Sequence, residues 1–155
     1  MPDSVPPNRP YSVSEELIEH AALHEAVSAA YDAAQRLARS ALVIIAAAVQ
    51  QILTNHSEDP RAPFDACHLE LLEADDMSLW STGRYWTADG KELTFGTTPG
   101  VEGAEMALFG LNEWVPCLDD SNRDTWNPLV TMPPRTGRRR YRLDLVRAAQ
   151  ALSLD

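Results

Sequence analysis

Two histidines in this chain, His20 and His24, have a spacing that suits metal chemistry. Residues four apart share one face of a helix, so both imidazoles could bind the same metal ion. Neither Glu-x-x-His nor His-Glu-x-x-His surrounds them, and a third ligand would have to come from elsewhere, with His68 and Glu70 of the predicted sheet as candidates. A small metal-dependent enzyme is therefore one alternative. The competing interpretation is two polar residues near a helix end that face solvent or a dimer seam. We expect no cofactor.

Motifs for nucleophilic catalysis are missing from the sequence. It contains neither Gly-x-Ser-x-Gly nor Gly-x-x-x-x-Gly-Lys-Ser/Thr. The adjacent Cys67 and His68 would point to opposite faces of a strand, which makes them a poor catalytic pair. We therefore predict no catalytic residue.

Segment 116–136 is rich in turn residues and acidic side chains and contains one tryptophan. Its carboxylates could take part in acid–base chemistry, but solvated turns explain them better. We expect the tryptophan to be exposed because it lies inside a polar loop, and aromatic residues often anchor protein interfaces. The predicted partner-binding residues are Asp119, Asp120, Asp124 and Trp126.

One basic cluster lies near the C-terminus and consists of Arg135, Arg138, Arg139, Arg140 and Arg142. Such a cluster can contact phosphate or RNA, which gives a nucleic-acid-associated regulator as a further alternative. It can equally dock on an acidic surface, including the protein's own body.

The net charge of the 155-residue chain is −10, and it is unevenly distributed. Residues 1–134 hold 21 of the 23 acidic residues but only 7 of the 13 basic ones. Such a surface repels nucleic acid and attracts basic proteins. A basic protein is therefore the expected partner, and nucleic acid the less favoured one.

The stretch from Ser12 to Thr54 carries His20 and His24, and we expect the later elements to pack against it. It contains no Gly or Pro, and its apolar residues recur at helical spacing. It predicts one long helix, or two stacked ones, over about residues 14–54. We expect it either to pair with a second copy or to be covered by the chain's own later elements. The residues predicted for self-association are Val27, Tyr31, Ala34, Ala38, Ala41 and Ile45.

The remaining elements follow from local signals. Residues 67–95 predict a three-stranded antiparallel meander, in which Asp89-Gly90 forms a two-residue hairpin loop. This register places Trp86, Leu93 and Phe95 on the core face and Tyr85 on the outer face. Shorter helices are expected over 102–114 and 138–154, with a short edge strand over 129–132.

The predicted fold class is therefore α+β: a long N-terminal helix packed on a three-stranded meander and followed by two shorter helices. Residues 1–11 hold four prolines and form a separate N-terminal arm, whereas residues 12–155 form one domain. The apolar run at 41–49 is too short to cross a bilayer, no signal peptide is visible, and the two cysteines do not suggest a disulfide scaffold. We expect a cytoplasmic protein without membrane contact.

These observations favour a non-catalytic, acidic interaction protein. It would self-associate through its long helix and bind or block a macromolecular partner as an adaptor, immunity protein, inhibitor or assembly component. The metal-dependent enzyme and the nucleic-acid-associated regulator stay open as alternatives.

Overall fold

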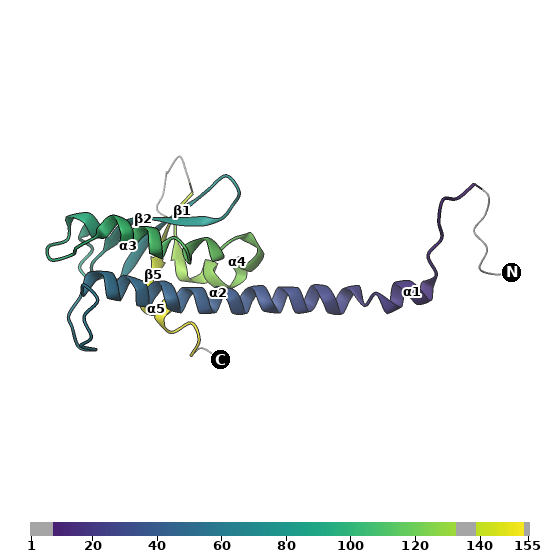
Figure 1. The fold of residues 1–155 in the computed structure, drawn as a ribbon, viewed down its shortest axis with the longest axis horizontal. Coiled ribbons are helices and arrows are strands. Elements are labelled where there is room, and N and C mark those ends of the chain that lie inside the picture. Colours follow the sequence, from purple (N-terminus) through teal and green to yellow (C-terminus); the bar gives the residue numbers. More distant parts are fainter. Residues whose placement is uncertain (1–7, 133–138, 154–155) are drawn as a thin grey trace.

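The computed structural model describes residues 8–132 and 139–153. It combines a long N-terminal helix with an antiparallel sheet and several short helices (Figure 1). The α-helices are α1 (Glu15–His20), α2 (Leu23–Leu53), α3 (Ala104–Leu111), α4 (Arg123–Trp126) and α5 (Leu145–Ala149). The strands are β1 (His68–Glu73), β2 (Leu79–Trp86), β3 (Glu92–Thr94), β4 (Val130–Thr131) and β5 (Arg140–Asp144).

The long helix is nearly continuous, as predicted. Ser14 caps α1 by accepting a hydrogen bond from the backbone N–H of Leu17 at 3.2 Å. A break at Ala22, whose φ of 49° is left-handed, separates α1 from α2. The helix ends where Thr54 donates its hydroxyl to the Gln50 carbonyl at 2.8 Å and Asn55 adopts a φ of 54°, the left-handed conformation expected after a helix.

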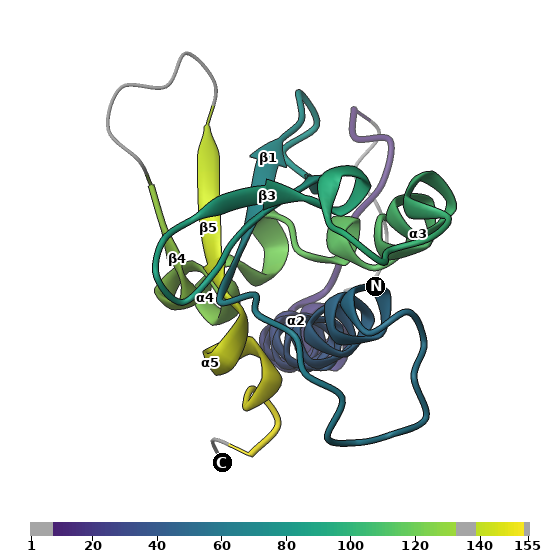
Figure 2. The ribbon, with the colours of Figure 1, turned by 90° about the vertical axis from the view of Figure 1, so that its left-hand side faces the viewer.

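The core lies between one face of the sheet and the second half of α2. Leu42 and Ile45 of α2 pack with Leu69 and Leu71 of β1, and all four are fully buried. Figure 2 looks along α2, with the sheet above it and with α3 and α5 on its two sides. The body of the protein, which we define as residues 35–132 and 139–153, therefore includes the second half of α2 and covers it on three sides.

The sheet has five strands in the order β3-β2-β1-β5-β4, not the three predicted. The prediction of a helix over 138–154 is wrong for residues 140–144, which form β5 on the free edge of β1. Tyr141 and Leu143 alternate into the core, with 3% and 0% of their surface exposed, so the period is that of a strand. Only α5 remains of the expected helix, and Asp144 caps it by accepting a hydrogen bond from the N–H of Arg147.

The hairpin register also differs from the prediction by one residue. Thr87 donates its N–H to the Lys91 carbonyl at 2.9 Å, so the loop has three residues rather than two. Gly90, with a φ of 85°, supplies the left-handed residue that such a loop needs. Because a one-residue shift reverses the faces, Tyr85 enters the core, where it stacks on Phe95 at 5.7 Å, and Trp86 moves to the other face.

The stretch from Glu15 to Leu53 is long and apolar enough to cross a membrane by length and composition alone. One third of its most apolar window is buried in the body, and a core helix passes the same test.

Candidate functional site

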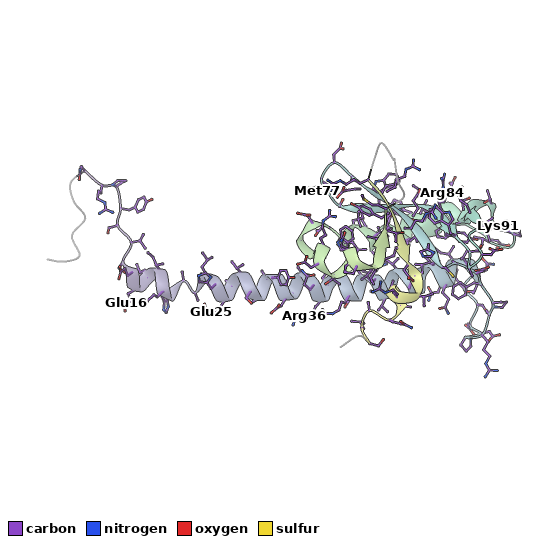
Figure 3. All side chains as sticks on the ribbon, turned by 180° about the vertical axis from the view of Figure 1, so that it is seen from behind. Glu16, Glu25, Arg36, Met77, Arg84 and Lys91 are labelled. Atoms are coloured by element: carbon purple, nitrogen blue, oxygen red, sulfur yellow. The ribbon has the colours of Figure 1, made fainter. Side chains whose placement is uncertain are left out.

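The most unusual feature of the surface is the first half of the long helix. We define residues 15–34 as the helical arm. Figure 1 shows it extending far beyond the body, and Figure 3 shows Glu16 and Glu25 along this extension. Every described residue from 8 to 33 is exposed. Large apolar side chains are among them: Leu17, Leu23 and Val27 expose 59%, 68% and 60% of their surface.

The structure divides the six residues predicted for self-association into two groups. Ala38, Ala41 and Ile45 are buried in the chain's own core, with at most 2% of their surface exposed. For these three residues, the body provides the cover that a second copy was expected to provide. Val27 and Tyr31 lie exposed on the arm, and Ala34 is half-buried where the arm meets the body.

A small set of polar contacts holds the arm where it leaves the body. The hydroxyl of Tyr31 donates a 2.6 Å hydrogen bond to the Asp124 carboxylate. One turn later, Gln35 is buried, donates its side-chain amide to the Ser121 carbonyl at 3.3 Å and accepts the Thr125 hydroxyl at 2.5 Å. The direction of the arm is therefore set by the loop between residues 119 and 126.

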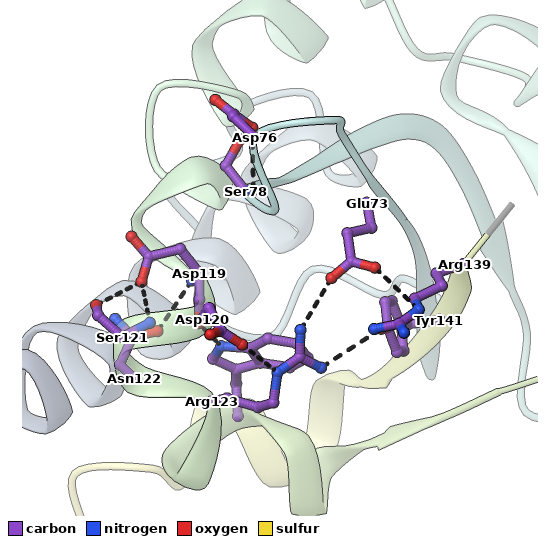
Figure 4. A network of polar contacts seen from close by, with 11 residues as sticks. Glu73, Asp76, Ser78, Asp119, Asp120, Ser121, Asn122, Arg123, Arg139 and Tyr141 are labelled. Carbon is purple, nitrogen blue, oxygen red and sulfur yellow. Dashed lines mark hydrogen bonds and ion pairs between the residues drawn. The ribbon is translucent and has the colours of Figure 1, made fainter.

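Arg123 ties the same loop to the sheet (Figure 4). Its guanidinium lies 2.9 Å from carboxylate oxygens of both Glu73 and Asp120 and 3.5 Å from the Tyr141 hydroxyl. It also lies over the Trp126 ring, 4.6 Å from the centroid. Hydrogen bonding to Tyr141, and then to the two carboxylates, raises the pKa of Arg123 above its ordinary value.

The predicted partner-binding residues serve the fold of their own chain. Asp119 accepts hydrogen bonds from the N–H and hydroxyl of Ser121 (Figure 4), Asp120 pairs with Arg123, and Asp124 accepts from Tyr31. The expectation that Trp126 is exposed is wrong. Its ring is fully buried, and its indole N–H donates to the Asp119 carbonyl at 2.8 Å. A polar loop can bury a tryptophan when backbone carbonyls satisfy the indole.

The three histidines of the metal hypothesis lie on three different elements. His20 ends α1, His24 lies beyond the break in the arm, and His68 begins β1 in the body. Within residues 8–132 and 139–153, no group of three or more His, Cys, Asp or Glu side chains is placed to hold a metal ion.

The arginines of the basic cluster that the structure describes contact acidic and aromatic groups of the body. Arg139 lies 3.5 Å from Glu73, and Arg140 lies 3.9 Å from Glu70. The guanidinium of Arg142 stacks over the Trp86 ring at 4.0 Å from its centroid. Arg135 and Arg138 fall outside the described residues.

Sequence reasoning missed Arg123 and Gln35, which join the arm, the loop and the sheet. One signal was available for Arg123, because it is the single basic residue of segment 116–132. Gln35 could have been found as a polar residue between Ala34 and Ala38, two of the residues predicted for self-association.

The chain was compared with protein-family models, with curated proteins and with solved structures. None of the three comparisons found a match. The function is therefore inferred from the geometry of this molecule.

Proposed function

We propose that this protein is a non-catalytic interaction protein and that the helical arm is its docking element. One observation supports this most directly: the arm exposes a run of large apolar side chains without any cover from the body. Most helical stability in proteins comes from packing an apolar face, and the body provides no such packing for residues 15–33. Exposed apolar surface of this kind usually marks an interaction site.

The acidic residues of the arm lie beside its apolar side chains. They favour a protein partner whose contact surface is basic. Four glutamates, Glu15, Glu16, Glu19 and Glu25, are exposed on it. No Lys or Arg occurs between residues 10 and 35. A basic partner would gain from these charges, chiefly in its rate of association, and its binding would weaken as salt is added.

The arm can be tested with a variant that adds two charges to its apolar residues, Leu23→Lys with Val27→Lys. Both side chains are exposed, so the thermal unfolding of the body should be unchanged. Ser28→Lys is the control, because it adds one lysine at a neighbouring exposed position about a quarter of a helical turn away from Val27.

Native mass spectrometry of the protein purified from its own host gives the readout. We expect wild type and Ser28→Lys to carry a protein partner, either a second copy or another chain, and the double variant to be a bare monomer. A wild-type protein that is a bare monomer, or a double variant that keeps its partner, would contradict the proposal.

A further inference from the structure

We infer that the outward face of α2 binds the same face of a second copy of this chain, with the two helices antiparallel and crossing near Gln35. This inference depends on the proposed function and identifies one partner of the helix.

The outward face is a second apolar stripe, distinct from the one that packs on the sheet. Its large members, Leu23, Leu37 and Ile44, expose 68%, 51% and 38% of their surface. Its small members are Ala26, Ala30, Ala33, Ser40 and Ala47. The steps alternate between three and four residues from 23 to 47, and no member is charged. A mean spacing of 3.5 residues over about 36 Å of helix is the pattern of a coiled-coil seam.

The order of large and small residues favours the antiparallel orientation. With the helices crossing near Gln35, Leu37 of one copy lies level with Ala33 of the other, and Ile44 lies level with Ala26. Leu23 lies level with Ala47 in the same way. Every large residue then meets a small one, and Ala30 meets Ser40, so the distance between the helix axes varies less than in a parallel pair. A parallel pair would place Leu37 on Leu37 and Ala33 on Ala33, and the required distance would change from layer to layer.

The charges beside the stripe favour the same orientation and register. Asp32, Arg36 and Arg39 flank it, and none of the ion pairs within the described residues uses them. In the antiparallel pair, Asp32 of one copy falls between Arg36 and Arg39 of the other. The two Arg36 groups also approach each other near the axis, with both Asp32 carboxylates beside them. In a parallel pair each of these residues would lie on the opposite side of the seam from its own copy, and these contacts between Asp32 and the two arginines would not form.

The body offers further apolar surface where this register needs it. A groove of about 470 Å³ lies between the end of α2 and α3, where Met106 and Trp114 line it together with Glu102 and Glu113. Met106 and Phe109 of α3 expose 76% and 71% of their surface. Residues 19–22 of the second copy would lie level with residues 48–51, beside this groove. The arm of each chain would therefore be covered by the body of the other.

The orientation is tested by cross-linking single-cysteine variants of the full chain in a background where Cys67 and Cys117 are replaced by Ser. An equal mixture of Ala26→Cys and Ile44→Cys should form a disulfide-linked dimer between the two variants. Each variant alone should form none, because like positions lie about 27 Å apart in the antiparallel pair. Leu37→Lys should weaken dimerisation at least about tenfold, whereas Ser28→Lys, on the opposite side of the arm from the stripe, should not.

Three outcomes would overturn the inference. A cross-link formed by Ala26→Cys alone shows a parallel pair. An Asp32→Arg variant that dimerises as tightly as wild type shows that the expected charge contacts are not made. A chain that is monomeric at all concentrations but whose arm retains a different protein also rejects the second copy as the occupant. In this last case the proposed function stands while the inference fails, so the two failures are distinguishable.

Discussion

The phenolic hydroxyl of Tyr31 donates a 2.6 Å hydrogen bond to the carboxylate of Asp124, 93 residues later in the chain. This contact lies at the point where the long helix leaves the body, one turn before the first buried residue of α2, Gln35. It joins an exposed residue of the arm to the loop that Arg123 fixes on the sheet. The base of the arm is therefore held by a polar contact at its edge and by apolar packing behind it.

This contact makes a prediction about pH. The hydrogen bond to Asp124, together with the negative charge of that carboxylate, raises the pKa of Tyr31 above its ordinary value of 10.0. The contribution of the contact to stability is therefore complete below about pH 10, the ordinary tyrosine pKa, and is lost as the pH rises through the higher folded-state value. Tyrosinate ultraviolet absorbance, taken as the difference between wild type and Tyr31→Phe, reports the titration of Tyr31.

Asp124→Asn is the variant that tests the cause of this shift. We expect Tyr31 to titrate at lower pH in this variant than in wild type, because the amide carries no negative charge. If both proteins titrate Tyr31 at the same pH, the hydrogen bond does not exist in solution.

We expect a large loss of stability when Arg123 is replaced by Ala. Arg123→Ala leaves Glu73, whose side chain is only 8% exposed, with Arg139 at 3.5 Å as its remaining ion-pair partner among the described residues. We expect the free energy of unfolding to fall by about 2–3 kcal/mol, as measured by urea denaturation, because a largely buried carboxylate loses its closest cation and the Trp126 ring loses its cover.

The matched control for this substitution is Arg139→Ala. Arg139 contacts the same carboxylate, but its side chain is 62% exposed, so we expect a change of no more than about 0.5 kcal/mol. Equal losses in the two variants would show that Arg123 does not connect the loop to the sheet.

Alanine substitutions at three glycines should lower the free energy of unfolding by different amounts. Gly83 in β2 has a φ of 85°, and an added Cβ would lie 3.3 Å from the Phe95 ring. Gly83→Ala should therefore lower the free energy of unfolding by about 2–3 kcal/mol through backbone strain and crowding together. Gly90 has the same φ but open space around it, so Gly90→Ala should cost only the strain, about 1 kcal/mol.

Gly96→Ala completes the series as the control. Gly96 has neither a left-handed φ nor a neighbour within 4 Å of the added Cβ, and we expect a change within about 0.5 kcal/mol. Denaturant unfolding of the three variants should rank them in this order. A Gly83→Ala variant as stable as Gly96→Ala would contradict the packing of β2 against Phe95.

Local signals determined much of this fold. The absence of Gly and Pro from residues 12–54 indicated the long helix, and Asn55 marked its end. The Asp89-Gly90 pair placed a hairpin between β2 and β3 correctly. Helix α3 lies within the predicted range 102–114, and β4 lies within the predicted edge strand over 129–132. These features depend on backbone conformation and on the periodicity of neighbouring residues, which a short stretch of sequence carries by itself.

Tertiary structure alone decided the rest. Residues 140–144 are a strand because β1 has a free edge on which they pair and because Tyr141 and Leu143 fill the core. The conformation of this segment therefore depends on a strand some seventy residues earlier in the chain. The hairpin register depends on the packing of Tyr85 against Phe95 in the core. Trp126 is buried because its indole N–H donates a hydrogen bond to a backbone carbonyl. Apolar residues recur at helical spacing both before and after Gln35, yet the body covers only the part of the helix that follows Gln35. Periodicity shows that a face will be buried, but only the packing of distant segments decides what buries it.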